Sequence, residues 1–333
     1  MNGLIKIRNV AVQAVEKACF ACLEIQSQMV TDDTINKKDQ SPVTVGDYTV
    51  QALIINEILN NLDEEYPFIA EEDSKTLSEQ KDVQTKVLSF FNKFSHTAIN
   101  EQQLSALLDK GTNRDAIKSS KRWWTLDPID GTLGFLRKDQ YAVALALMED
   151  NKPILGVLGC PSLPVSFADQ SLGKGCVFVA LSKEGSFMKT LSDPSKETKI
   201  SVSSKSDPSK AIFTESYVSR GFAGELNSNI SKNMGVVDQE PLKIDSQCKY
   251  AMVARGDSDV YVRLTNLDYR ECIWDHAAGQ IIVEEAGGIV KDFKGNDLDY
   301  SVGYKLENNV GIACSNKSLY TPLTQAIKKS IDL

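Results

Sequence analysis

The chain has 333 residues, of which 42% are hydrophobic and 25% are charged, and its net charge is −8. This length allows a large core and, by size alone, two domains. The negative charge argues against nucleic acid or an anionic membrane surface as the main partner. A small anionic substrate stays compatible with it, because a local cation can reverse the sign of a site.

Cysteine and histidine content sets further limits. Seven cysteines are scattered through apolar segments and only two histidines occur, which argues against a zinc site and favours reduced thiols. Charged residues interrupt the N-terminal segment where a secretory signal would need an apolar run, and no window approaches 18 uncharged apolar residues. We therefore expect a cytoplasmic protein without a membrane span, and a monomer.

Apolar periodicity predicts the elements of the first half. Spacing of three and four residues predicts helices over 7–29, 48–62, 83–94 and 104–108. Short apolar runs predict strands over 68–70, 123–126, 141–148, 153–159, 176–180 and 185–189. A polar loop separates the first two helices at 31–41, and the region 74–120 is peripheral.

The second half begins after the polar stretch 192–199. Its predicted strands cover 200–203, 211–214, 260–263 and 309–314, and its main predicted helices cover 274–285 and 319–331. The glycine pair at 287–288 ends the first of these helices. The elements together predict an α+β N-terminal domain with an antiparallel sheet, residues 1–196, and an α/β C-terminal domain, residues 197–333.

One stretch places two carboxylates three residues apart with a proline between them. Leu126 is the predicted end of a buried strand, because the proline prevents further regular pairing. The turn that follows can aim Asp127 and Asp130 at one point, where they repel each other unless a cation or proton lies between them. Mg²⁺ suits such oxygen ligands. The next residues, Gly131 and Thr132, offer backbone N–H groups to a phosphate.

Three further places put acids at the ends of elements, namely Asp47, Glu71 with Glu72, and Asp275. Each has a structural alternative. Asp47 fits a capping box with Thr44, Asp275 fits an N-cap, and the glutamate pair fits a solvated acidic turn. Asp-Pro and Asp-Gly pairs are also common in turns.

Three ordered motifs resemble those of the inositol monophosphatase superfamily of lithium-sensitive, magnesium-dependent phosphatases. They are Ala70-Glu71-Glu72, residues 127–132, and residues 274–279 followed by 285–288. The likeness spans nearly the whole chain and implies a layered αβαβα sandwich of the inositol monophosphatase/sugar phosphatase type. Segments 41–51, 245–250 and 259–276 are similar to the branch of 3′(2′),5′-bisphosphate nucleotidases, which remove the 3′-phosphate of adenosine 3′,5′-bisphosphate.

The resemblance implies roles for matching positions. Two or three Mg²⁺ ions would be held by Glu71, Asp127, Asp130, Asp275 and the backbone carbonyl of Ile129. Thr132, hydrogen-bonded to Asp47, would orient and deprotonate the attacking water. The implied substrate contacts are Gly131, Thr132, Ser246, Lys249, Tyr250, Arg263 and Asp275, with Lys249 and Arg263 binding the second phosphate.

Alternatives stay open for several of these residues. Surface solvation is the alternative for Ser246, Lys249 and Arg263, and core packing is the alternative for Tyr250. We expect packing roles for His276, Cys248 and Cys272.

The sequence also departs from the family pattern in two places. The glutamate motif is flanked by Ala70 and Asp73 where the family usually has glycine and serine. A histidine that often contacts the nucleotide has no counterpart near 216–222, where Arg220 is the nearest candidate.

The predicted function is hydrolysis of the 3′-phosphate of adenosine 3′,5′-bisphosphate, and of its 5′-phosphosulfate form, with Mg²⁺ required and Li⁺ inhibitory. The alternative within the enzyme class is an inositol polyphosphate 1-phosphatase acting on inositol 1,4-bisphosphate, or an enzyme with both activities. The alternative outside it is a metabolite sensor that binds the nucleotide without turnover. None of the metal carboxylates is lost, which favours chemistry.

Overall fold

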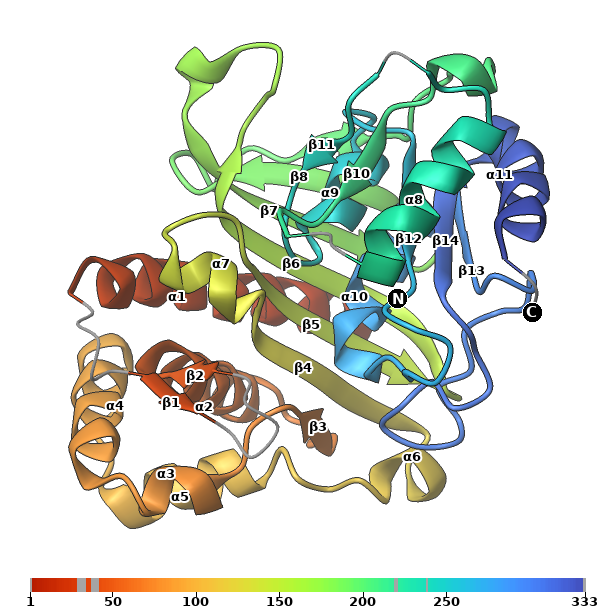
Figure 1. The fold of residues 1–333 in the computed structure, drawn as a ribbon. Coiled ribbons are helices and arrows are strands. Elements are labelled where there is room, and N and C mark those ends of the chain that lie inside the picture. Colours follow the sequence, from red (N-terminus) through yellow and green to blue (C-terminus); the bar gives the residue numbers. More distant parts are fainter. Residues whose placement is uncertain (1, 29–33, 37–41, 219–220, 238, 332–333) are drawn as a thin grey trace.

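The computed structural model describes residues 2–28, 34–36, 42–218, 221–237 and 239–331. Helices and sheets alternate in five layers, as expected from the resemblance (Figure 1). The helices are α1 (Asn2–Gln28), α2 (Val45–Asn61), α3 (Ser74–Ser78), α4 (Lys81–Phe94), α5 (Glu101–Asp109), α6 (Ala116–Ser119), α7 (Thr132–Leu136), α8 (Gly221–Asn233), α9 (Cys248–Ala254), α10 (Ala277–Glu285) and α11 (Lys317–Ser330).

The seven-stranded sheet has the order β3-β4-β5-β6-β7-β8-β9 and is antiparallel except for the parallel pair β3 and β4. Its strands are β3 (Phe68–Ala70), β4 (Arg122–Asp130), β5 (Ala142–Glu149), β6 (Lys152–Pro164), β7 (Lys174–Leu181), β8 (Gly185–Thr190) and β9 (Thr198–Ile200). In β5, Val143 and Leu145 face α1 and α2, while Ala144 and Ala146 face the inner helix layer. Because both faces are covered, the strand is a continuous apolar run.

The five-stranded sheet has the order β11-β10-β12-β14-β13 and mixes parallel and antiparallel pairs. Its strands are β10 (Phe213–Glu215), β11 (Leu242–Lys243), β12 (Val260–Arg263), β13 (Gly288–Lys291) and β14 (Ile312–Asn316), and a small separate hairpin joins β1 (Thr34–Asn36) to β2 (Pro42–Thr44). Helices α9 and α10 form the layer between the two large sheets, and α8 and α11 cover the outer face (Figure 1).

Most predicted elements are confirmed, and the differences have local causes. The strand predicted to end at Leu126 continues as β4 to Asp130, with a register shift between Asp127 and Asp130 that accommodates the proline. The helix predicted from Trp274 begins as a 3₁₀ turn at Ile273–Asp275, and α10 follows it. The predicted loop 31–41 contains β1, and the rest of that loop lies outside the described residues.

The predicted domain boundary after residue 196 stays a prediction. Strand β9 lies just beyond it and pairs with β8, so the seven-stranded sheet extends slightly past this position. None of the described helices combines the length and apolarity needed to cross a membrane.

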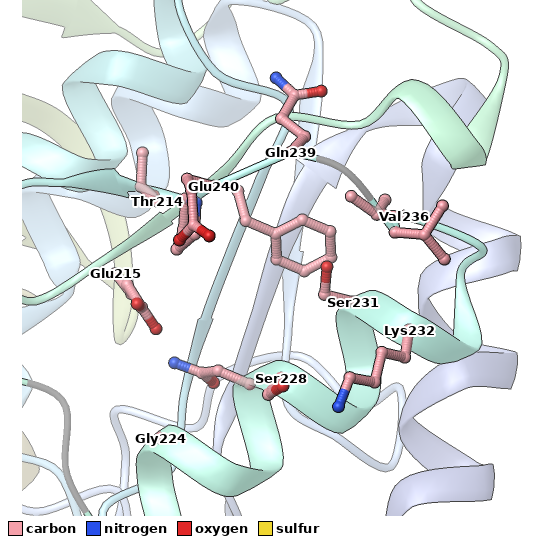
Figure 2. Close-up of a pocket in the computed structure, with 13 residues that line it drawn as sticks. Thr214, Glu215, Gly224, Ser228, Ser231, Lys232, Val236, Gln239 and Glu240 are labelled. Carbon is pink, nitrogen blue, oxygen red and sulfur yellow. The ribbon is translucent and has the colours of Figure 1, made fainter.

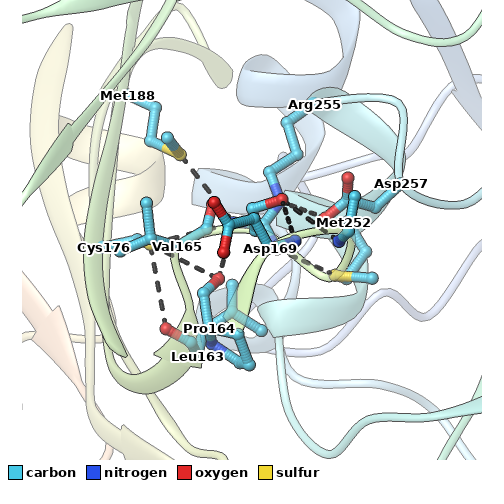
Figure 3. A network of polar contacts seen from close by, with 11 residues as sticks. Leu163, Pro164, Val165, Asp169, Cys176, Met188, Met252, Arg255 and Asp257 are labelled. Carbon is cyan, nitrogen blue, oxygen red and sulfur yellow. Dashed lines mark hydrogen bonds and ion pairs between the residues drawn. The ribbon is translucent and has the colours of Figure 1, made fainter. Parts of the chain in front are cut away.

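A buried arginine ties the loop after β6 to helix α9 (Figure 3). The Arg255 side chain is only 5% exposed, and its Nε donates to Asp257 Oδ2 at 2.6 Å. Its Nη1 donates to the carbonyls of Pro164 at 2.9 Å and Val165 at 3.2 Å. This network fixes the C-terminal end of α9 against the first sheet, and α9 carries Lys249 in its first turn.

Helices α9 and α10 approach each other closely at Gly279. A Cβ atom at this position would lie 2.2 Å from Tyr250 Cδ2, and the Tyr250 ring is fully buried.

We expect Gly279→Ala to lower the free energy of unfolding by about 1–3 kcal/mol through overpacking, measured by urea denaturation. Gly3→Ala in α1, where a Cβ would meet nothing within 4 Å, is the matched control and should be neutral or slightly stabilising. Equal stability of the two variants would contradict the close packing.

Candidate active site

Three carboxylates converge where β4 ends. Asp127 and Asp130 come from β4 and Asp275 comes from the 3₁₀ turn before α10, and one oxygen from each lies within 4.8 Å of the others. Asp127 is 2% exposed. Residues more than 140 positions apart in the sequence therefore meet at one point.

The other two predicted acids act on the same point. Burial raises the pKa of the Asp127 carboxyl well above its usual range, and nearby negative charges raise it further. In decreasing order of effect, these charges belong to Glu71, Asp130, Asp275 and Asp47. All five predicted acids thus belong to one electrostatic cluster.

Parallel pairing of β3 with β4 delivers the glutamate. Ala70 is the register partner of Leu126, so Glu71, the first residue after β3, comes to lie beside Asp127 of β4. The Glu71 backbone N–H donates to the Leu126 carbonyl at 3.2 Å, which continues the pairing by one residue. Neighbouring parallel strands point their ends in the same direction, which explains why two acids distant in sequence reach one site.

Asp47 caps the start of α2, which is the structural role that the sequence analysis gave as the alternative to a role in the site. Its Oδ2 accepts from Thr44 Oγ1 at 2.7 Å and from the Thr44 N–H at 2.8 Å, which completes a capping box at the start of α2. A Cβ on Gly46 would lie 2.8 Å from Ile129 Cδ1, so the first turn of α2 packs directly on the β4 end. The cap therefore also holds the Asp47 charge close to Asp127.

Ile129 lies near the end of β4, and Thr132 is the first residue of α7. Thr132 Oγ1 donates to the Ile129 carbonyl at 3.3 Å. A carbonyl oxygen has two lone pairs, so this bond leaves one for a cation. The predicted hydrogen bond between Thr132 and Asp47, and the predicted cation contact of Ile129, stay predictions.

Two backbone positions join the halves of the site. Gly131 has φ +88°, and a Cβ there would lie 3.0 Å from Ser246 Cβ. Ser246 itself has φ +63°, is 7% exposed, and accepts the Cys248 N–H on its Oγ at 3.2 Å. Glycine is favoured at position 131 because it relieves both the backbone strain and the contact. Ser246 is therefore buried, which disagrees with the alternative of surface solvation.

Lys249 is buried rather than solvated. It is 2% exposed, and its Nζ donates to Ser216 Oγ at 3.1 Å and to the Ile244 carbonyl at 3.2 Å. Burial, followed by the positive charge of Arg263, lowers the pKa of the Lys249 ammonium to about 8. Among the described residues, no carboxylate is hydrogen-bonded to Nζ, and a buried lysine in such surroundings suits an anionic ligand.

Arg263 is engaged by the protein itself. Its Nε donates to Glu271 Oε2 at 2.7 Å, and its Nη2 lies 3.7 Å from Asp275 Oδ2. Burial acts to raise the pKa of Glu271, but the charge and hydrogen bonds of Arg263 and His276 together outweigh it, and the pKa falls to about 2. The Arg263 side chain is 28% exposed, so it is partly buried and ion-paired rather than simply solvated, and its binding of a second phosphate stays a prediction.

Lys249 and Arg263 line one cavity of about 280 Å³, and Arg263 connects it to the carboxylates because its Nη2 lies 3.7 Å from Asp275 Oδ2. Polar groups from Ser216, Asn227 and Thr265 form part of the wall, and apolar side chains such as Leu264 form the rest. A separate cavity of about 420 Å³ lies between α8 and β10 (Figure 2), and none of the predicted site residues lines it. Arg220, the candidate for the missing histidine, lies outside the described residues.

Tyr250 and His276 form part of the core. Tyr250 is fully buried, its OH lies 2.8 Å from His276 Nδ1, and its ring meets Tyr261 edge-on at 4.9 Å. Of the two alternatives for Tyr250, the structure places the ring in the core. Burial lowers the pKa of His276, which favours the neutral ring and agrees with its predicted packing role.

The cysteines are all free thiols. Cys248 is buried, with its Sγ 3.3 Å from the Tyr141 carbonyl, and Cys272 is partly buried. The expected packing role of Cys248 agrees with this position, and reduced thiols agree with the cysteine pattern of the sequence.

The residues at the carboxylate cluster suit a hard divalent cation. Asp127 Oδ1 is buried and has no hydrogen-bond partner among the described residues, although its carboxyl is surrounded by other acids. Oxygen donors of this kind are the ligands that Mg²⁺ prefers. A second group, Glu271, Asp275 and His276, also has ligand atoms within 4.8 Å, but its Glu271 carboxylate is already hydrogen-bonded to Arg263.

Three residues with close links to the site were missed from the sequence. Glu271 pairs with Arg263, Gln51 binds the glutamate turn, and Gln247 binds both Asp130 and the turn before Asp275. Gln51 lies four positions after Asp47 and so shares its helix face, which is a signal that could have been used. No comparable local signal marks the other two.

The layered fold and the converging carboxylates are typical of one class of phosphatases, and the comparison with protein families gives the same class. The model of the inositol monophosphatase family matches residues 4–332, and the chain belongs to this family.

Comparison with individual proteins shows which members of the family this chain resembles. The chain is 73% identical over 329 residues to a 3′(2′),5′-bisphosphate nucleotidase of Dictyostelium discoideum, with 99% of this chain and 98% of that protein covered. It is 39% identical to 3′(2′),5′-bisphosphate nucleotidase 1 of Arabidopsis thaliana, covering 96% and 95%. CysQ from Bacteroides thetaiotaomicron, a bacterial member of the inositol monophosphatase family, has the same fold with a TM-score of 0.62 at 21% identity, covering 93% and 97%.

Removing one carboxylate should stabilise the metal-free protein. Because the folded-state pKa of Asp127 is raised, its ionisation opposes folding, and this cost grows as pH rises above the normal carboxyl range of about 4. We expect Asp127→Asn to raise the metal-free Tm by a few degrees at neutral pH, since about 1 kcal/mol corresponds to about 2–4 °C in chains of about 150–250 residues.

The pH dependence provides the check. In chelator-treated protein, the wild-type Tm should fall more steeply than that of the variant between about pH 5 and pH 8, measured by scanning calorimetry. Parallel curves for the two proteins would show that Asp127 does not carry this repulsion.

Proposed function

We propose that the chain is a Mg²⁺-dependent, Li⁺-inhibited phosphatase that converts adenosine 3′,5′-bisphosphate to AMP and phosphate. The observation that carries this proposal is the buried Lys249 in a cavity beside a converging set of carboxylates. Such an arrangement provides for two phosphates, one at the carboxylates through cations and one at the lysine. The 73% identical Dictyostelium relative, which is named a 3′(2′),5′-bisphosphate nucleotidase, supports the same substrate.

The cations would be held by acids from both halves of the chain. The candidate ligands are Glu71, Asp127, Asp130, Asp275 and the Ile129 carbonyl. Bound Mg²⁺ supplies Lewis-acid stabilisation of the phosphoryl oxygens and lowers the pKa of a water. Because these carboxylates repel one another, binding of a divalent cation between them is favourable.

The chain's own groups position the reactants. Thr132 Oγ1 lies in the turn directly after the carboxylates, and it would accept a hydrogen bond from the attacking water and pass a proton toward Asp47. The N–H groups of Gly131 and Thr132 would bind the phosphate oxygens, because the left-handed Gly131 is the N-cap of α7 and the first N–H groups of a helix have no acceptor within it.

Substrate choice would come largely from the second half. Lys249 would bind the 5′-phosphate, while Arg263 would form the wall of the cavity and orient Asp275. The predicted division at residue 196 fits this assignment, since four of the five acids precede it and Lys249 follows it. We also propose that the protein acts as a cytoplasmic monomer on small-molecule substrates.

A phosphate-release panel tests the function directly. Purified protein should release phosphate from adenosine 3′,5′-bisphosphate only with Mg²⁺, and Li⁺ should suppress the reaction. The kcat/KM values for inositol 1,4-bisphosphate and for the 5′-phosphosulfate nucleotide then show how wide the range of substrates is. No release from the bisphosphate nucleotide with Mg²⁺ would refute the proposal.

Asp130→Asn serves as the inactive control in this panel. It removes one carboxylate charge while keeping the side-chain size, and we expect turnover to be abolished. Activity near the wild-type level would instead remove Asp130 from the cation site.

Lys249 provides a separate prediction about the second phosphate. We expect Lys249→Ala to raise KM for the bisphosphate by about 10- to 100-fold with kcat little changed, since a hydrogen bond to a charged group contributes about 1.5–3 kcal/mol. Because its pKa is about 8, kcat/KM of the wild type should fall as pH rises through about 8, where the ammonium loses its proton.

A substrate without the second phosphate is the control for this effect. Adenosine 3′-monophosphate should show neither the KM change nor this pH dependence. A Lys249 variant that lowers kcat alone would place the lysine outside substrate binding.

A further inference from the structure

The carboxylate cluster needs supports that do not cancel its charge. Three of its acids lie within 4.8 Å of each other, and repulsion tends to separate the turns that carry them. A lysine or arginine placed on these carboxylates would hold them but would also compete with a divalent cation. A neutral amide can instead bind the backbone of each turn through one donor and one acceptor.

Gln51 binds the glutamate turn in this way. It is fully buried in α2, its Nε2 donates to the Glu72 carbonyl at 2.6 Å, and its Oε1 accepts the Glu72 N–H at 3.0 Å. Both backbone groups of Glu72 are thereby bound by one side chain. Because Glu71 directly precedes this residue, Gln51 fixes the direction in which Glu71 leaves β3.

Gln247 binds the opposite side of the cluster. It is 2% exposed, its Nε2 donates to the Trp274 carbonyl at 2.9 Å, and its Oε1 accepts the Gly279 N–H at 3.2 Å. Its own backbone N–H donates to Asp130 Oδ2 at 2.5 Å. One residue thus connects Asp130 with the turn that presents Asp275.

We propose that Gln51 and Gln247 are positioning residues that set the affinity of the cluster for Mg²⁺. The side-chain amide of each bonds to the backbone beside a carboxylate, and neither side chain adds charge or titrates, so neither amide occupies a carboxylate oxygen. Residues in such outer positions commonly change metal affinity by about 10- to 100-fold when substituted. The proposal depends on the proposed magnesium requirement and is independent of the substrate.

The test uses Gln51→Met and Gln247→Met, which keep the side-chain length and remove the amide. The Tm of the full chain is measured against Mg²⁺ concentration without substrate, so the readout does not depend on activity. We expect both variants to need about 10-fold or more Mg²⁺ for half of the thermal stabilisation seen in the wild type.

Gln280→Met is the matched control. Gln280 is a buried glutamine of α10, but its amide bonds to Tyr300 OH at 2.7 Å and to Glu284 at 3.0 Å, away from the carboxylate turns. It should lower the metal-free Tm without moving the Mg²⁺ midpoint. Equal midpoints in the wild type, Gln51→Met and Gln247→Met would overturn the proposal.

Two further measurements keep the test decisive. If a methionine variant shows no cooperative unfolding, the shorter amides of Gln51→Asn and Gln247→Asn replace it, with the same shift of the midpoint expected. In the phosphate-release assay, the variants should need more Mg²⁺ for half-maximal rate while KM for the nucleotide at saturating Mg²⁺ stays unchanged. Wild-type protein that binds Mg²⁺ but hydrolyses no nucleotide would refute the proposed function and leave this proposal standing.

Discussion

The repulsion between carboxylates gathered around Asp127 is the constraint on which the rest of the site depends. Burial and four neighbouring acids raise the pKa of this carboxyl, so the fold holds a cluster that a metal-free chain would tend to open. Backbone supports on both sides oppose that tendency. The parallel pairing of β3 with β4 holds Glu71 beside Asp127, and the hydrogen bond from the Gln247 N–H holds Asp130.

The five layers explain where this cluster sits. The ends of β3 and β4 supply acids from the first sheet, and α2 supplies Asp47. The 3₁₀ turn before α10 supplies Asp275, and α9 of the inner helix layer carries Lys249. The halves meet through contacts that allow no larger side chain, such as Gly131 against Ser246. A site built at such a junction depends on close packing of both halves, which gives small residues there a role in the chemistry.

A cationic side chain is available to a ligand only to the extent that no carboxylate of the protein is already paired with it. The sequence suggested Lys249 and Arg263 as equal partners for a second phosphate. In the fold, Arg263 is bound by Glu271 and lies near Asp275, whereas Lys249 is buried and its Nζ donates to two neutral oxygens. The two residues therefore differ in availability, since a guanidinium already paired with a carboxylate has less to gain from a phosphate.

The elements, the carboxylate motif and its ordered partners could be predicted from the amino-acid sequence, because apolar periodicity, capping residues and the Asp127 to Asp130 spacing are local properties of the chain. The sequence could not show that β4 continues past the proline, since a register shift depends on the neighbouring strand. Nor could it show the hydrogen bonds of Gln51 and Gln247, or the different partners of Lys249 and Arg263. These features depend on the folded chain, because burial, hydrogen-bond partners and the charge around each group arise from residues distant in sequence.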